Sequence, residues 1–216
     1  MMTRANKNEA VAALHRERIL SSSNELFIAK GYDKSTIDDI SKASGYSRRT
    51  LYAYFSSKED ILHNIIANGL SGLKGEIESA LDATEDFVSR FRGVFHAMHR
   101  YYLTQPLSAE KINSYSSVPG SSQLSDAACR IFAFGSEINT LLSAFVEEGI
   151  TQGIVCRGIN PLLSVQIFWS SASALFELLD AKSGYLTQTF GMPEDELLEY
   201  GFRQLANSIL EEKIIK

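Results

Sequence analysis

The sequence predicts an all-α fold, and three observations support this prediction. Apolar residues recur at the three- and four-residue spacing of a buried helix face along most of the 216-residue chain. All four prolines lie at residue 106 or later, so no proline interrupts a helix in the preceding part. No segment shows a sustained alternation of apolar and polar residues, which is the pattern of a half-buried strand.

The composition is typical of a soluble globular protein, with 44% hydrophobic and 22% charged residues. We find no uninterrupted apolar run of the ~18 residues that a membrane span needs, and no apolar core of a secretory signal. The net charge of −5 is uneven. Residues 1–60 carry ten Lys and Arg against eight Asp and Glu, whereas residues 61–216 carry eleven against eighteen. The N-terminal part is therefore the better able to approach phosphate.

Two helices are predicted in the first 44 residues. The first carries Ile19 and Phe27 on one face and ends near Gly31, where a glycine suits the left-handed position that often terminates a helix. Thr36 suits the N-cap of the second helix. Asp39 follows three residues later, which is a near capping box with Asp in place of Glu.

A tight turn and a short third helix follow. Gly45 accepts the positive φ that a three-residue turn often requires, and Ser47 suits the next N-cap. Leu51 and Phe55 would point inward and pack with Ile40. Two short helices around such a turn form a helix-turn-helix. The outward face of the third helix consists of side chains that donate hydrogen bonds, none of them acidic: Ser47, Arg48, Arg49, Thr50 and Tyr54.

Longer helices are predicted in the remainder of the chain. Ser56 and Glu59 form a capping box of the Ser-x-x-Glu type at the start of the next helix. Asn160 and Pro161 are a typical N-cap and first helical residue. The predicted helices cover residues 58–80, 85–104, 125–149, 162–180 and 195–210, and the serine- and proline-rich residues 106–124 are predicted to be a mobile loop.

The order and spacing of residues between Arg18 and Leu62 resemble the DNA-binding domain of the tetracycline-repressor-like (TetR) family. The resemblance implies a helix-turn-helix domain over residues 1–57 and a helical ligand-binding and dimerisation domain over residues 58–216, linked by the helix 58–80. The residues that carry it are Ile19, Leu26-Phe27, Gly31-Tyr32, Thr36-Ile37, Ile40, Gly45-Tyr46-Ser47, Thr50-Leu51-Tyr52, Tyr54-Phe55 and Ser57-Lys58.

The resemblance also implies the DNA contacts. Arg49 stands where many members have glycine or proline, and it adds a group able to contact phosphate or guanine. Tyr52 has a second interpretation as a core residue, and the arginines have one as a solvated face. Lys58 opposes the helix dipole, so a nearby phosphate would relieve that conflict. Thr36, Tyr52, Tyr54 and Lys58 are expected at phosphates, and Ser47, Arg48, Arg49 and Thr50 in the major groove.

The resemblance implies a ligand pocket in the C-terminal part, where aromatic residues recur at helical spacing. An aromatic lining suits a flat or lipophilic ligand, and the alternative is an ordinary hydrophobic core. The candidate pocket residues are Phe91, Phe95, Met98, Tyr102, Phe132, Phe145 and Trp169.

The resemblance also implies a dimer built from the last two helices. Their apolar stripes are wide, and two subunits would place two helix-turn-helix motifs about 34–36 Å apart on a pseudo-palindrome. The alternative is that these stripes are buried within one chain. The candidate interface residues are Val165, Phe168, Ala172, Leu175, Phe176, Leu198, Gly201 and Leu205.

We therefore expect a cytoplasmic, sequence-specific regulator of transcription that a small apolar or aromatic ligand releases from its operator. The alternatives are an activator, a ligand-independent DNA binder and a ligand-binding module without a role on DNA. The expected partners are double-stranded DNA, a second copy of the chain and an unidentified effector, without a membrane. No cofactor, metal or catalytic motif is expected, because His96 and His99 lack a third ligand and Cys129 and Cys156 lack a basic cluster.

Overall fold

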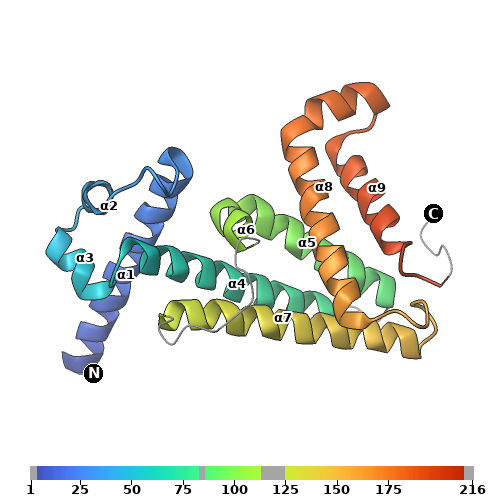
Figure 1. Ribbon diagram of the computed structural model, residues 1–216, viewed down its shortest axis with the longest axis horizontal. Coiled ribbons are helices and arrows are strands. Elements are labelled where there is room, and N and C mark those ends of the chain that lie inside the picture. The colour runs from blue at the N-terminus through green and yellow to red at the C-terminus, as the bar shows by residue number, and fades with distance from the viewer. Residues whose placement is uncertain (1–3, 83–85, 113–124, 212–216) are drawn as a thin grey trace. The chain divides into compact units, whose positions relative to one another are not determined.

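The computed structural model describes residues 4–82, 86–112 and 125–211, and its elements are α-helices (Figure 1), which confirms the predicted fold class. An isolated antiparallel bridge pairs Val155 with Leu210. The described helices are α1 (Arg4–Lys30), α2 (Ile37–Ser44), α3 (Arg48–Tyr54), α4 (Lys58–Asp82), α5 (Phe87–Thr104), α6 (Pro106–Ile112), α7 (Asp126–Thr151), α8 (Pro161–Phe190) and α9 (Glu194–Ala206).

The predicted ends of the first three helices are confirmed. Gly31 follows α1 with φ 85°, and Gly45 follows α2 with φ 76°, both in the left-handed region. The Thr36 side chain accepts a hydrogen bond from the Asp39 backbone, and the Asp39 carboxylate accepts one from the Thr36 backbone, so the capping box is complete. The side chain of Ser47 caps α3.

The structure corrects the predicted cap of α4. The Ser57 hydroxyl, rather than that of Ser56, accepts from the backbone of a residue three positions on, which is Asp60. The Asp60 carboxylate accepts in turn from the Ser56 backbone at 2.9 Å. The pair that caps this helix is therefore shifted by one residue from the predicted Ser56 and Glu59, and it satisfies the N–H groups of Asp60 and Ser56.

The prediction of a loop over residues 106–124 is wrong for its first seven residues, which form α6. Pro106 occupies the first helical position, where its missing N–H costs nothing, and Leu107 and Ser108 are buried. The burial of one apolar side chain thus supports a helix that a serine- and proline-rich composition did not suggest. Residues 113–124 lie outside the described part of the chain.

The chain forms two compact units. The first contains residues Met1–Leu70 and Gln105–Ala133, and its core includes Ile19, Phe27, Ile40 and Leu51. The second contains Ser71–Thr104 and Phe134–Lys216. Helix α4 contributes its first half to one unit and its second half to the other. The functional boundary at residue 57 stays a prediction.

Helix α8 carries more apolar surface than its own chain covers. Asn160 and Pro161 start it as predicted, and its φ/ψ angles leave the helical region at Lys182. By length and composition it is the one described helix able to cross a membrane, with a mean hydropathy of 1.4 in its best 18-residue window. Only 28% of that window is buried. In water, such a helix needs further protein to cover it.

Candidate nucleic-acid interface

The helix α3 is presented by contacts on its inner side. Seven residues are too few for a helix to be stable by itself in water. Leu51 and Phe55 are 1% and 3% exposed, and these two side chains anchor α3 to the core. The Ser47 hydroxyl accepts from the Thr50 backbone at 3.2 Å and lies 2.9 Å from the Thr50 hydroxyl. The outward face of α3 is therefore fixed before any partner binds.

Two arginines of α1 hold the C-terminal ends of the two short helices. Arg16 Nη1 donates to the Tyr54 carbonyl at 2.8 Å, and Arg18 Nε donates to the Ser44 carbonyl at 3.2 Å. The Arg16 guanidinium also lies 4.6 Å from the centre of the Phe55 ring. A cation at a helix C-terminus satisfies free carbonyls and opposes the dipole favourably. Sequence analysis did not identify these positioning residues.

The predicted major-groove residues Ser47, Arg48 and Arg49 are exposed, and Thr50 is half-exposed. Within the described part of the chain, the Arg49 guanidinium has no hydrogen bond or ion pair. Tyr52 is 56% exposed, so its interpretation as a core residue is wrong and its side chain is available at the surface. This face carries hydrogen-bond donors and no carboxylate, as the sequence predicts.

Arg48 has a partner that sequence analysis did not foresee. Its guanidinium forms an ion pair with the Asp38 carboxylate of α2, and both side chains are largely exposed. The pair links the two helices of the helix-turn-helix across the turn. Because exposed ion pairs are weak, a phosphate or a guanine can compete with Asp38 for this guanidinium.

Thr36 lies exposed at the N-terminus of α2, where a phosphate contact is expected. Hydrogen bonds from Lys30 and then Thr36 hold the pKa of Asp39 far below its usual range. The Asp39 carboxylate therefore stays ionised and keeps the capping box formed at any ordinary pH. The Thr36 hydroxyl is already within hydrogen-bond distance of that carboxylate, so a phosphate would share the site.

Tyr54 and Lys58 are engaged inside the first unit. The Tyr54 hydroxyl lies 3.0 Å from His15 Nδ1. Lys58 Nζ donates to the carbonyls of Tyr32 and Ser35, each at 2.9 Å, and lies 4.1 Å from the centre of the Tyr32 ring. Two carbonyls and a ring thus relieve the conflict of Lys58 with the dipole without a phosphate. The phosphate contacts of both residues stay predictions.

Comparison with known protein families identifies the same helix-turn-helix segment. Residues 19–65 match the family model described as "Bacterial regulatory proteins, tetR family". The match includes all of α2 and α3 and the first residues of α4. The chain carries a TetR-family DNA-binding domain over these residues.

Relatives of the chain are described as transcriptional regulators. The uncharacterised helix-turn-helix regulator YvdT of Bacillus subtilis is 39% identical over 71 residues, which are 33% of this chain and 37% of YvdT. A second regulator from the same organism, YvaF, is 27% identical over 74% of this chain and 80% of its own length. The chain thus spans just over a third of one relative and most of the other.

A solved structure shows the same fold. It is that of AibR in complex with isovaleryl coenzyme A and operator DNA, with a TM-score of 0.68 and 14% identity over 88% of this chain and 97% of AibR. At that identity the likeness concerns the fold alone.

The second unit has an aromatic cluster, defined here as Phe87, Phe91, Phe95, Phe145, Phe168, Phe176 and Phe202. The Phe87 and Phe145 rings stack with centroids 4.2 Å apart. Beside Phe91, Phe145 and Phe168 lies an apolar cavity of about 30 Å³. That volume holds one or two water molecules, whereas ligand pockets measure roughly 300–1,000 Å³.

The predicted pocket residues divide between core and other positions. Phe91 and Phe145 line the small cavity, and Phe95 and Met98 are buried in the core. Tyr102 and Trp169 are half-exposed, and Phe132 belongs to the first unit, unlike the other six candidates. In this state the aromatic residues form a packed core, which is the alternative that sequence analysis left open. Their role toward a ligand stays a prediction.

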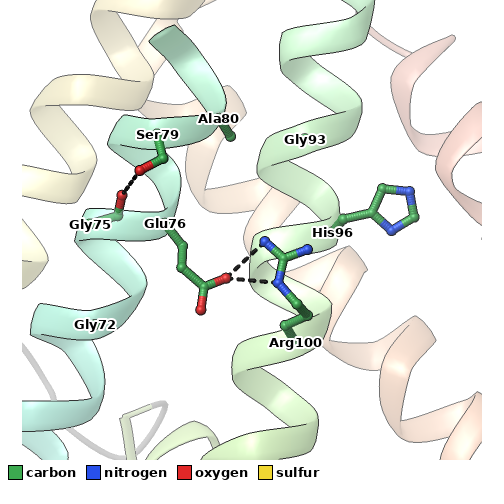
Figure 2. Close-up of a pocket in the computed structure, with 8 residues that line it drawn as sticks. All are labelled: Gly72, Gly75, Glu76, Ser79, Ala80, Gly93, His96 and Arg100. Carbon is green, nitrogen blue, oxygen red and sulfur yellow. Dashed lines mark hydrogen bonds and ion pairs between the residues drawn. The ribbon is translucent and has the colours of Figure 1, made fainter. Parts of the chain in front are cut away.

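A larger, open groove of about 720 Å³ lies between α4 and α5 (Figure 2). Gly72, Gly75 and Gly93 contribute no side chains to its walls. Arg100 reaches across it and donates to Glu76 at 2.9 Å, whereas His96 points away from α4 and lies 2.8 Å from Glu199 of α9. Sequence analysis did not identify this groove, because its only signal was a set of glycines within predicted helices.

The structure places the predicted dimer residues inside the monomer. Ala172 and Phe176 of α8 are almost wholly buried, and α8 packs against α9 and α5. A Cβ on Gly201 would lie 2.3 Å from Leu175 Cδ2, so this glycine permits the close contact of α9 with α8. The others (Val165, Phe168, Leu198 and Leu205) are also buried or half-buried. Their role in a dimer interface stays a prediction.

Another face of α8 is exposed and apolar. Leu163, Ile167 and Leu178 are 58%, 59% and 41% exposed. They recur at helical spacing, with the small residue Ala174 exposed among them. We call Leu163, Ile167, Ala174 and Leu178 the outer face of α8. Sequence analysis missed it because α8 is apolar on more than one side.

Proposed function

We propose that this chain is a homodimeric repressor of the TetR family that binds a pseudo-palindromic operator and is released by a small apolar or aromatic ligand. The observation that carries the proposal is the outward face of α3, which presents Arg49 without a partner in the described residues. A seven-residue helix held by a capped start and two buried side chains is suited to insertion into a major groove.

The outer face of α8 supports dimerisation. Three large apolar side chains at helical spacing are exposed on a helix of which 28% is buried over its most apolar window. A second copy packing α8 against α8 across a two-fold axis would remove these side chains from water. The same two-fold axis would present two copies of α3 to the two halves of an operator.

The aromatic cluster supports an apolar effector. The cavity beside Phe91, Phe145 and Phe168 has a wholly apolar character but room for no organic molecule. A ligand would therefore bind a state in which these rings have separated, and it would shift the population toward that state. The structurally similar AibR is described in complex with both an acyl coenzyme A and operator DNA.

A second candidate function, a ligand-independent DNA binder, is favoured by the small volume of that cavity. The two functions predict different effects of added compounds on DNA affinity. Repression with release requires a compound that raises the melting temperature of the protein and lowers its affinity for DNA. A panel of apolar and aromatic compounds, tested first by thermal shift and then by DNA titration, separates the two.

We expect Arg49→Ala to weaken operator binding by about 1–3 kcal/mol, roughly 5- to 150-fold, because it removes a base or phosphate contact. The measurement is fluorescence anisotropy with an operator duplex selected from a random pool, at two salt concentrations. If the DNA affinity falls equally on all sequences and depends less on salt concentration than that of the wild type, the lost contact was to phosphate rather than to a base. Arg157→Ala, which changes an exposed arginine of the second unit, is the control. Equal affinities of both variants and the wild type would contradict the role of α3.

We expect Asp38→Asn to strengthen binding to unrelated DNA several-fold. The substitution removes a carboxylate beside α3 and frees the Arg48 guanidinium for phosphate. The discrimination between operator and unrelated duplexes should fall, because the released side chain no longer has a fixed position. Anisotropy on both duplexes measures the ratio, and an unchanged or higher ratio would show that Asp38 does not position Arg48.

A further inference from the structure

The first unit contains a polar groove of about 450 Å³ that no part of the proposed function uses. It lies among α1, α4, the residue before α6 and the first turns of α7. Most of its lining side chains are polar or charged, and all of its lining residues belong to the first compact unit. The lining residues that matter here are Arg16, Glu17, Asn24, Asn64, Gln105 and Arg130. We call this the amide–arginine groove.

Two guanidinium groups from different helices converge on one neutral atom in this groove. Arg130 Nη2 donates to Asn64 Oδ1 at 2.8 Å, and Arg16 Nη2 donates to the same oxygen at 3.4 Å. The Asn64 side chain is 95% buried, since its residue is 5% exposed, and Asn64 Nδ2 donates to the Asp60 carbonyl at 2.8 Å. The amide is thus oriented with its oxygen toward both arginines.

This arrangement leaves positive charge without an equal counter-charge. An amide oxygen accepts hydrogen bonds but carries no net charge, so it does not neutralise two guanidinium groups. Glu17 is the one carboxylate among the lining residues. The lining side chains are therefore net positive in a chain whose formal charge is −5, and the nearby Asp60 carboxylate accepts from Asn64 Nδ2 at 3.1 Å. An oxyanion between the arginines would form charge-assisted hydrogen bonds, which are stronger than those to an amide.

We propose that the amide–arginine groove binds a small polar organic acid, with its carboxylate or phosphate between Arg16 and Arg130. The side-chain amides of Asn24, Asn64 and Gln105 supply donors and acceptors for hydroxyl groups on the rest of the ligand. Glu17 accepts from such a hydroxyl and disfavours a second negative charge at its end of the groove. This ligand differs in class from the apolar effector of the aromatic cluster.

A hydrogen bond connects this groove directly to α3. The guanidinium of Arg16 that faces the groove also donates to the carbonyl of Tyr54, the last residue of α3. An anion that draws Arg16 toward the groove weakens this bond and changes how the end of α3 is held. Resting on the proposed function, this connection makes the polar acid a regulator of operator affinity.

Isothermal titration of the full-length chain with citrate and with inorganic phosphate, at constant ionic strength set by sodium chloride, tests the binding. We expect saturable binding of at least one probe, weakened about tenfold or more by Arg130→Gln. Arg130 is exposed and makes its described hydrogen bond only to Asn64, so this variant should fold. Arg157→Gln is the matched control and should bind as the wild type does. Binding of citrate alone assigns a carboxylate ligand, and binding of phosphate alone assigns a phosphorylated one.

Equal titrations of the wild type and both variants, or no saturable binding in any of them, would overturn the proposal. A second measurement tests the connection to α3, using anisotropy on the operator with and without the saturating probe. We expect a several-fold change in operator affinity for the wild type and Arg157→Gln, and none for Arg130→Gln. An unchanged affinity despite intact anion binding overturns the regulatory step. Failure of all proteins to bind any duplex overturns the proposed function instead, because the titrations without DNA still report on the groove.

Discussion

Ile167→Asp should convert the dimer into a monomer and weaken operator binding more than a hundredfold. Ile167 is 59% exposed in the single chain and lies in the middle of the outer face of α8. In a symmetric interface the substitution would bury two carboxylates in an apolar contact, where neither has a cationic partner. Binding through two linked sites exceeds that through one by roughly 10²–10⁴, and the monomer would lose this gain. Analytical ultracentrifugation measures the mass, and anisotropy the affinity.

Leu103→Asp provides the matched control for this substitution. Leu103 is 56% exposed on α5, in the same unit, and lies outside the outer face of α8. The control should remain dimeric and bind DNA as the wild type does. A wild-type chain that sediments as a monomer, or an Ile167→Asp variant that stays dimeric, would exclude the outer face of α8 as the interface. Association of the wild type with lipid vesicles would show that a membrane covers this face instead.

The helix boundaries were predictable where one residue type has one strong local role. The glycines after α1 and α2, Ser47 and the Asn160-Pro161 pair are examples, because a positive φ or a free N–H group requires such residues there. The cap of α4 was misplaced because two adjacent serines are each followed three residues later by an acid. Local sequence does not distinguish these registers, whereas packing of the helix against the core does.

The burial of α8 shows what the spacing of apolar residues in the sequence does not determine. A pattern of apolar residues identifies a helix, but a helix apolar on several sides has no unique inner face. Ala172 and Phe176 pack within the chain, and Leu163 and Ile167 do not. The choice follows from shape: Gly201 on α9 leaves room for Leu175, and this contact sets the rotation of α8. Such a match between residues far apart in sequence is not visible in either helix alone.

The exposed residues of the candidate interface were predictable because the helix-turn-helix is a local motif. Their internal partners were not. Arg16 contacts Tyr54 across 38 positions, and Lys58 contacts Tyr32 across 26. The amide–arginine groove joins Asn64 to Arg130 across 66 positions. Sequence spacing carries no information about contacts of this range, so positioning residues and grooves emerge only from the fold.

Phe95→Ala should lower the free energy of unfolding by about 3–5 kcal/mol, the usual cost of removing a buried aromatic ring. Phe95 is fully buried, and its ring lies 5.2 Å from the rings of Phe176 and Phe202, measured between centroids. The melting temperature should fall by roughly 6–20 °C for a chain of this size. Thermal unfolding followed by circular dichroism measures it. Phe190→Ala, at a position 60% exposed, is the matched control and should change stability by less than about 0.5 kcal/mol.

The same variant separates the two roles of the aromatic cluster. If these rings are purely core, the cavity left by Phe95→Ala admits a small apolar molecule such as benzene, which restores part of the lost stability and leaves operator affinity unchanged. If the cluster is the effector site, benzene bound there also lowers operator affinity, because occupation of the cluster favours the released state. A variant as stable as the wild type would contradict both roles, since Phe95 would then contribute little to the packing of the second unit.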